Sequence, residues 1–166
     1  MQSSREREQA IDPTLEALYQ RPGFLLRRAH QLSVGIFEAQ CRDVGLTPPQ
    51  YGVLLILAVS EGIDQSTLSR ALGFDRVTTL RVVRGLETRR LLRRAQSASH
   101  RNRLQLALTD AGRWLIKQAK EPADRASERL LSPLTPDERT TLTGLLTKLC
   151  AGLEPVARTR VVPPGI

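Results

Sequence analysis

Apolar residues recur at helical spacing in the first third of the chain. From residue 24 to about residue 43 they fall three or four positions apart, which predicts an amphipathic helix closed by Gly45. The next segment opens with Thr47-Pro48-Pro49-Gln50, a capping box with proline at the first helical position, and predicts a helix to about Ser60. The interior positions that we expect to be buried are Val53, Leu54, Leu57 and Ala58.

Two short helices with a tight connection are predicted next. Asp64 is the predicted N-cap of a helix that Gly73 ends, and Asp75 caps another helix two residues later. Such a short glycine-containing turn between helices is typical of a helix-turn-helix. In the second helix one row is apolar (Leu80, Val83, Leu86) and another is polar or small (Thr78, Arg81, Gly85, Thr88). Short side chains on that free face suit a major groove about 12 Å wide.

A pattern with a period of two follows the second helix. Leu104, Leu106 and Leu108 alternate with polar or small residues, and the polar stretch 97–102 separates them from an extended segment at 91–96. These features predict a two-stranded hairpin directly after the helix-turn-helix. Such a wing has a cationic tip that can contact phosphates or the minor groove.

The last third of the chain returns to helical spacing. A helix is predicted from Thr109, kinked or interrupted at Pro122, and a second from the capping box Thr135-Pro136-Asp137-Glu138. The second carries an apolar stripe of Leu142, Leu145, Leu146, Leu149 and Leu153. We expect the stripes of the first and last helices to pack together and against a second copy, in preference to an intramolecular bundle.

Together these elements predict one soluble, mainly α-helical domain with a small β-wing over residues 1–166. It comprises a winged helix-turn-helix lobe at 46–108 and dimerisation helices at 22–44 and 109–153, with flexible ends at 1–12 and 155–166. The longest apolar run, 53–59, is far below the roughly 18 to 20 residues that span a bilayer. With a charged N-terminus and no signal peptide, a cytoplasmic protein without membrane contact is expected.

The two cysteines indicate neither a disulfide framework nor a metal site. Cys41 and Cys150 lack any metal-binding spacing, so no zinc site is predicted. Buried, inert thiols are favoured over a redox switch, because neither context suggests a lowered thiol pKa with exposure.

Positive charge is concentrated in one segment. Residues 70–103 hold ten arginines and two acids, so this segment alone carries the net charge of +8 that the whole chain has. Arginine suits phosphate oxygens and guanine edges. No aromatic residue between Asp75 and Arg113 offers a stacking platform for single strands or RNA loops. Double-stranded DNA is therefore favoured over an anionic membrane, an acidic protein or a solvated face without a partner.

Three motifs, in this order and spacing, resemble the MarR family of bacterial transcriptional regulators across roughly residues 22–153. They are LTPPQY at 46–51, LSRALGFDRVTTLRVVRGL at 68–86 and LTDAG at 108–112. The resemblance implies a homodimer whose terminal helices interlock and whose two winged lobes bind a palindromic operator. It also implies repression relieved by a small aromatic acid, with no cofactor. The runs 21–31 and 74–87 resemble members that govern aromatic-acid catabolism, including repressors of nicotinic-acid degradation, which implies 6-hydroxynicotinate as a candidate effector.

The candidate DNA contacts follow from position and from this resemblance. Base-edge contacts are expected from Arg76, Thr78 and Arg81, in the first turns of the second helix. Phosphate contacts are expected from Ser66, Arg84 and Arg103. Arg101 matches the family arginine that enters the minor groove. For each arginine the alternative is a phosphate contact without sequence readout.

The candidate effector contacts lie near the first two helices, because family pockets lie between the terminal-helix bundle and the winged lobe. Arg28 could pair a carboxylate, His30 and Ser33 could hydrogen-bond a hydroxyl, and Tyr51 could flank a ring. The alternatives are a surface charge for Arg28, a satisfied core or interface histidine for His30, and packing for Tyr51.

Two positions depart from the family pattern. Ser99 stands where members often carry an aspartate that orients the wing arginine. Arg90 stands where glycine commonly ends the recognition helix in a left-handed turn, so a different helix end is expected.

Two other classes of function are alternatives. An enzyme is disfavoured, because the chain has two histidines and no GxSxG, HExxH, Walker A or GxGxxG motif. A winged-helix module that binds an acidic protein would show no operator preference and no steep dependence on salt.

Overall fold

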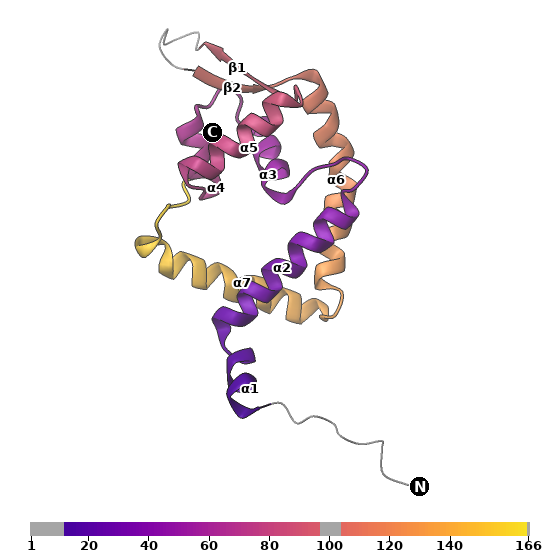
Figure 1. Cartoon of the computed structure of the whole chain (residues 1–166), viewed down its shortest axis with the longest axis vertical. Helices are drawn as coiled ribbons and strands as arrows, with labels where there is room; N and C mark the ends of the chain where they lie inside the picture. The colour runs from indigo at the N-terminus through magenta and orange to yellow at the C-terminus, as the bar shows by residue number, and fades with distance from the viewer. Residues whose placement is uncertain (1–11, 97–103, 166) are drawn as a thin grey trace.

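The computed structural model describes residues 12–96 and 104–165, and within them it is mainly helical with one small sheet. The helices are α1 (Pro13–Tyr19), α2 (Pro22–Gln40), α3 (Pro48–Val59), α4 (Gln65–Leu72), α5 (Arg76–Thr88), α6 (Asp110–Leu131), α7 (Pro136–Leu153) and the 3-10 helix η1 (Glu154–Val156). Strands β1 (Leu92–Gln96) and β2 (Leu104–Leu108) pair antiparallel. In Figure 1, α3 to α5 and the sheet form one lobe, and α6 leads from it to α7. The predicted fold class is confirmed.

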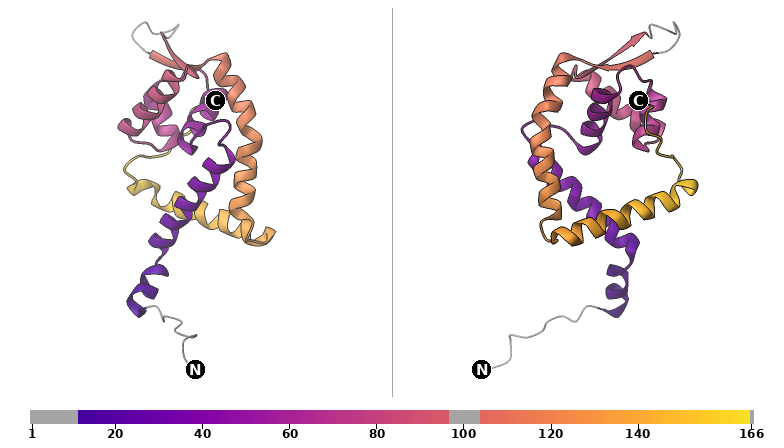
Figure 2. Two further views of the ribbon diagram at one scale, coloured as in Figure 1. Left: turned by 45° about the vertical axis from the view of Figure 1, so that its right-hand side comes forward. Right: turned by 180° about the vertical axis from the view of Figure 1, so that it is seen from behind.

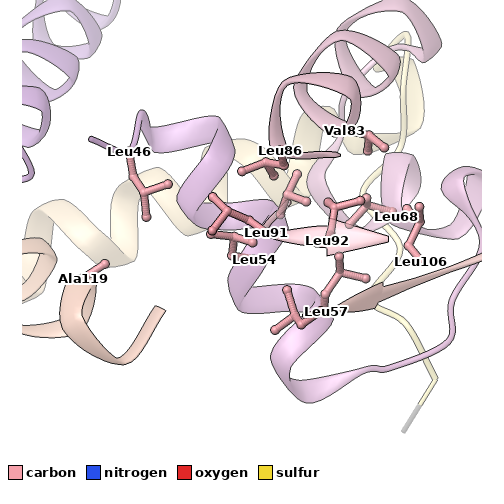
Figure 3. Packing of buried hydrophobic residues seen from close by; sticks show 12 residues of the cluster. Leu46, Leu54, Leu57, Leu68, Val83, Leu86, Leu91, Leu92, Leu106 and Ala119 are labelled. Carbon is pink, nitrogen blue, oxygen red and sulfur yellow. The ribbon is translucent and has the colours of Figure 1, made fainter. Parts of the chain in front are cut away.

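One apolar core holds this lobe together. Leu54 and Leu57 of α3, Leu68 of α4 and Leu86 of α5 are completely buried, and Figure 3 shows them converging with leucines of the sheet. Burying each leucine contributes about 1.5 to 3 kcal/mol. Ala58 was expected in this core and is exposed, because it falls on the side of α3 that carries exposed Leu55.

The predicted helix starts are confirmed by their capping bonds. The Thr47 amide donates to Gln50 Oε1 at 3.1 Å, and the Thr135 amide donates to Glu138 Oε2 at 2.8 Å, as expected of two capping boxes. The Asp64 carboxylate accepts the Thr67 amide at 2.8 Å. Each bond satisfies a backbone donor that the helix itself leaves unpaired, so the local sequence fixes where these helices begin.

The chain leaves α5 through a residue with left-handed backbone angles that is not glycine. Arg90 has φ 56°, the Leu91 amide donates to Leu86 O at 3.0 Å, and the Arg90 amide donates to Glu87 O at 2.8 Å. This pair of bonds is a Schellman motif, and the accompanying apolar contact is supplied by buried Leu86 and Leu91. The expectation of a different helix end was therefore wrong. The burial of Leu91 holds the turn although a side chain at this φ is strained.

Replacing Arg90 with glycine should stabilise the chain by about 0.5 to 1 kcal/mol, because glycine adopts this φ without strain. The matched change Arg89→Gly should destabilise it, since Arg89 has right-handed backbone angles and its guanidinium donates to Gly45 O at 2.8 Å. Thermal unfolding tests both predictions: the melting temperature should rise in Arg90→Gly and fall in Arg89→Gly. A lower melting temperature for Arg90→Gly would contradict the strain at this position.

The C-terminal helices differ from the sequence-based picture in two ways. α6 continues through Pro122, although proline removes one backbone hydrogen bond, because buried Ala119, Ala123 and Ala126 hold the turns around it. The predicted interruption is therefore wrong. The sequence pattern predicted that α2 packs along α7. In the structure α2 packs along α6 instead. The leucine stripe of α7 is exposed in this single chain.

No helix among the described residues combines the length and the apolar character needed to cross a bilayer.

Candidate nucleic-acid interface

Helix α5 has one buried side and one exposed side. Thr79, Val83 and Leu86 are fully buried against the lobe. Val77, Arg81, Arg84 and Thr88 are exposed, and at 3.6 residues per turn they share the opposite side. Val77, 75% exposed, was missed by the sequence reasoning because only polar and small residues were sought on this side. An apolar side chain there suits the methyl group of thymine.

The start of α5 is fixed by Asp75. Its carboxylate accepts the Thr78 amide at 2.7 Å and the Thr78 hydroxyl at 2.9 Å. The Thr78 amide is the main cause that lowers the pKa of Asp75, with smaller contributions from the Thr78 hydroxyl and from Arg81. The Thr78 hydroxyl therefore already donates its proton to the cap. Toward a base edge it can act only as a hydrogen-bond acceptor.

Two buried hydroxyls hold the turn between α4 and α5 and the first turn of α5. Ser69 Oγ donates to Phe74 O at 2.6 Å, and Thr79 Oγ1 donates to Asp75 O at 2.8 Å. Neither oxygen is left unsatisfied in the interior. The Ser69 bond thus adds to leucine packing in holding the start of α5 against α4.

A hollow of about 570 Å³ lies between α4 and α5, lined by Gln65, Ser66, Ser69, Arg70, Arg76 and Thr79. It brings together two predicted contacts, Ser66 and Arg76. It also adds Arg70 and Gln65, which the sequence reasoning did not select; the signal for Arg70 was its place at the start of the arginine-dense segment. The Arg70 guanidinium, the Ser66 hydroxyl and the Gln65 amide form a site for a phosphate oxygen or another anion, and Arg76 lies beside them at the start of α5.

Not every arginine of the cationic segment is available to a partner. Arg89 donates to Gly45 O at 2.8 Å and so ties the end of α5 to the loop before α3. Arg94 Nε lies 2.9 Å from Glu87 Oε1, and both side chains are less than one-third exposed. These two arginines support the lobe itself, which the charge count could not distinguish. Arg81 and Arg84 are exposed on α5.

The wing is described only at its base. The register runs from Leu92 opposite Leu108 to Gln96 opposite Leu104, and Leu92 and Leu108 are buried. Leu106 exchanges backbone bonds with Gly62 and Ile63 just before α4, which attaches the sheet to the helix-turn-helix. The predicted contacts Arg101 and Arg103, and the departure at Ser99, lie outside the described residues.

Two of the four candidate effector residues lie at the junction of α2, α3 and α6. The Tyr51 ring of α3 packs on Phe37 of α2 with centroids 5.5 Å apart. Half-buried Ser33 lies one helical turn before Phe37, on the same side of α2. Burial is the main cause that raises the pKa of Tyr51, and the charge of Asp124 adds to it. Asp124 pairs with Lys120 at 2.7 Å, so α6 adds polar groups that the sequence reasoning missed.

Arg28 and His30 are both exposed on α2. Arg28 is nine positions before Phe37, which is two and a half helical turns, so Arg28 lies on the opposite side of α2 from Phe37 and points away from Tyr51. His30 shares the side of Phe37 but lies about two turns away along the helix. One chain therefore does not bring Arg28 and Tyr51 to a common site.

The two thiols differ in their surroundings. Cys41 is buried, and this burial raises the pKa of its thiol more than nearby Arg125 lowers it. Cys150 was expected to be buried and is exposed, because the leucine stripe of α7 that surrounds it has no cover within this chain. No cluster of potential metal ligands occurs in the described parts of the chain.

Comparison with known proteins agrees with this geometry. A family model described as MarR family matches residues 44–101. A "putative transcriptional regulatory protein for hcr operon" of Thauera aromatica is 33% identical over 131 residues, which cover 76% of this chain and 77% of that protein. The relatives and the family are transcriptional regulators, not enzymes.

Two solved structures add detail. The transcriptional repressor CouR bound to a 23-mer DNA duplex has 33% identity and a TM-score of 0.75, with 82% of this chain and 96% of that chain covered. BpsR of Bordetella bronchiseptica, whose DNA binding is regulated by 6-hydroxynicotinic acid, has 30% identity and a TM-score of 0.74, with 79% and 94% covered. On this identity and coverage, and on the winged helix-turn-helix that carries them, the chain belongs to the MarR family of transcriptional regulators.

Proposed function

We propose that this chain forms a homodimeric repressor, which binds a palindromic operator in double-stranded DNA and is released by a small aromatic acid. The observation that carries the DNA part is the exposed side of α5, with Arg81 and Arg84, beside the hollow that contains Arg70 and Arg76. CouR, a relative with this fold, is bound to a DNA duplex.

In this proposal the exposed side of α5 enters the major groove. Arg76, Thr78 and Arg81 contact base edges, and Ser66, Arg70 and Arg84 hold phosphates around the groove. Arg103 contacts a phosphate and Arg101 enters the minor groove. Two lobes of a dimer would address half-sites about 10 base pairs, or roughly 34 to 36 Å, apart.

The dimer is supported by apolar side chains that the single chain leaves uncovered. On α7 the five leucines of the stripe are between 37% and 61% exposed. On α2, Leu25 and Leu32 are about half exposed. Exposed apolar patches of this kind mark protein interfaces, and a second copy supplies the complementary leucines.

The double change Leu145→Glu with Leu149→Glu should shift the chain to a monomer, because both carboxylates would be buried without partners. We expect the dimer dissociation constant to rise about tenfold or more. Ala151→Glu is the matched control, since Ala151 is exposed on the side of α7 away from the leucines. Sedimentation across a concentration series measures both. An unchanged dimer in the double variant would remove α7 from the interface.

For the effector we propose the junction of α2, α3 and α6. Tyr51 would flank the aromatic ring, and Ser33 and His30 would hydrogen-bond a ring hydroxyl. Arg28 lies on the side of α2 that we assign to the second copy, so it would reach a carboxylate held by that copy. The effector would favour a lobe spacing that no longer matches successive grooves. BpsR, regulated by 6-hydroxynicotinic acid, supports a hydroxylated heteroaromatic acid as the first candidate.

One experiment tests the whole proposal. Random duplexes retained by the purified protein are sequenced, and aromatic acids including 6-hydroxynicotinate are then screened for release of the selected sequence. We expect a palindromic consensus and a log–log salt slope of about −5 or steeper, as for six or more phosphate contacts. Equal retention of random and selected duplexes would favour the alternative, a winged-helix module that binds an acidic protein.

A further inference from the structure

The C-terminal segment returns to the helix-turn-helix. Residues 157–165 leave η1 and run back to the lobe, as the yellow trace in Figures 1 and 2 shows. They belong to the end, 155–166, for which the sequence predicted flexibility. The Val162 amide donates to the carbonyl of Arg70 in the last turn of α4 at 3.0 Å. The same carbonyl also accepts the Gly73 amide at 3.3 Å, so the Val162 amide is a second donor to an oxygen at the C-terminal cap of α4.

A second contact lies next to this bond. A Cβ placed on Gly73 would stand only 2.9 Å from Cγ2 of Val161, so the valine side chain lies directly against the glycine that ends α4. Gly73 has φ 65°, and the turn to the recognition helix starts there. The segment therefore contacts the turn that sets the angle between α4 and α5.

The other end of the segment is attached to α7. The carboxylate of Glu154, the residue that caps α7, accepts the Val161 amide, and the Arg160 guanidinium donates to Pro155 O at 3.2 Å. These bonds close residues 154–161 into a loop, so α4 is joined to the end of α7 through a short connection. Val161 and Val162 are about half exposed, so the attachment buries little area and can open.

We propose that residues 157–165 form a latch that holds the helix-turn-helix at a fixed position relative to α7, and that the latched form is the one that binds DNA. None of the residues lining the hollow between α4 and α5 comes from this segment, so the latch leaves the DNA-facing side open. Arg70 connects the two features, because its carbonyl holds the latch and its side chain lines the hollow. The inference rests on the proposed DNA binding.

The latch restricts the positions that the winged lobe can take relative to α7 in the DNA-free protein. A lobe already held near its bound position loses less conformational entropy on binding. By linkage, DNA that prefers the latched form must also close the latch further. Because α7 carries the proposed dimer contacts, the latch also relates the position of each recognition helix to the dimer interface.

Val162→Pro tests the latch, since it deletes the donated N–H while keeping Arg158 and Arg160. We expect operator affinity to fall about tenfold, and at least as far when the chain is ended after Ala157, which also removes Arg158 and Arg160. Val162→Ala is the matched control: it keeps the N–H and should bind within about twofold of the unchanged chain. Hydrogen exchange without DNA should be faster in Val162→Pro at the amides of Gly73 and Phe74, and operator DNA should slow exchange of the Val161 amide in the unchanged chain.

Equal operator affinity of the unchanged chain, Val162→Pro and the shortened chain would overturn the latch. So would unchanged exchange at Gly73 and Phe74 in Val162→Pro. If the unchanged chain does not prefer an operator over random DNA, the proposed function fails instead. The exchange comparison uses no DNA, so it then still decides whether the segment holds the lobe.

Discussion

Replacing Arg81 with alanine is expected to weaken operator binding by about 1 to 3 kcal/mol and to relax the base preference at one position of each half-site. Arg81 is exposed on the side of α5 that is free of the core, one turn after the cap formed by Asp75 and Thr78. Its guanidinium can make two parallel hydrogen bonds to guanine, and no shorter side chain replaces them. Binding measured on a set of operators with single base changes shows the relaxed position.

Arg84→Ala provides the comparison on the same exposed side of α5. As a phosphate contact, Arg84 should contribute equally on operator and random duplexes, and its loss should reduce the salt slope by about one. If Arg81→Ala instead weakens operator and random DNA alike, Arg81 is a phosphate contact and base readout falls to Arg76 and Thr78. Measuring both variants at two salt concentrations separates the two roles.

Gly112→Ala is expected to destabilise the fold by about 3 kcal/mol or more, although alanine normally favours a helix. A Cβ at this position would lie 2.0 Å from the carbonyl oxygen of Leu91. That oxygen accepts the Thr109 amide at 3.1 Å, so the start of β1 and the cap of α6 both hold it in place. Relief requires backbone movement, because no side-chain rotation removes a contact with the main chain.

Gly144→Ala is the matched control for this change. Gly144 lies within α7 on the side away from the leucine stripe, and an added Cβ meets nothing within 4 Å. Alanine there should raise stability by about 0.5 to 1 kcal/mol through helix propensity alone. In chemical denaturation we expect the free energy of unfolding to fall in Gly112→Ala and to rise in Gly144→Ala. An unchanged free energy of unfolding in Gly112→Ala would contradict this prediction, since it would show that β1 and α6 can move apart without loss of stability.

Much of the winged lobe could be predicted from local sequence because short-range bonds define it. The Thr47 capping box and the Asp64 and Asp75 caps are made between residues three apart, and each predicted a helix start correctly. The alternation of leucines in β2 likewise predicted the wing. These signals need no knowledge of tertiary structure.

The rest depended on contacts that one-dimensional patterns do not contain. Pro122 did not interrupt α6, because burial of neighbouring alanines outweighed the lost bond. Arg90 kept a left-handed turn that glycine usually makes, since buried Leu91 holds it. Among the arginines, the pattern could not separate Arg89 and Arg94, which bond within the lobe, from those exposed on α5. The contact between Val162 and Arg70 joins residues far apart in the chain, which no local motif records.

The continuity of α6 has a mechanical consequence. Its 22 residues start directly after β2 and end next to α7, so one rod about 33 Å long joins the wing to the far end of the molecule. A tilt of 5° at one end of such a rod moves the other end by about 3 Å, a large fraction of the spacing between neighbouring base pairs. Pro122 is the point where its backbone ladder lacks a bond, so a bend of α6 at Pro122 would change how far the wing moves for a given displacement of α7.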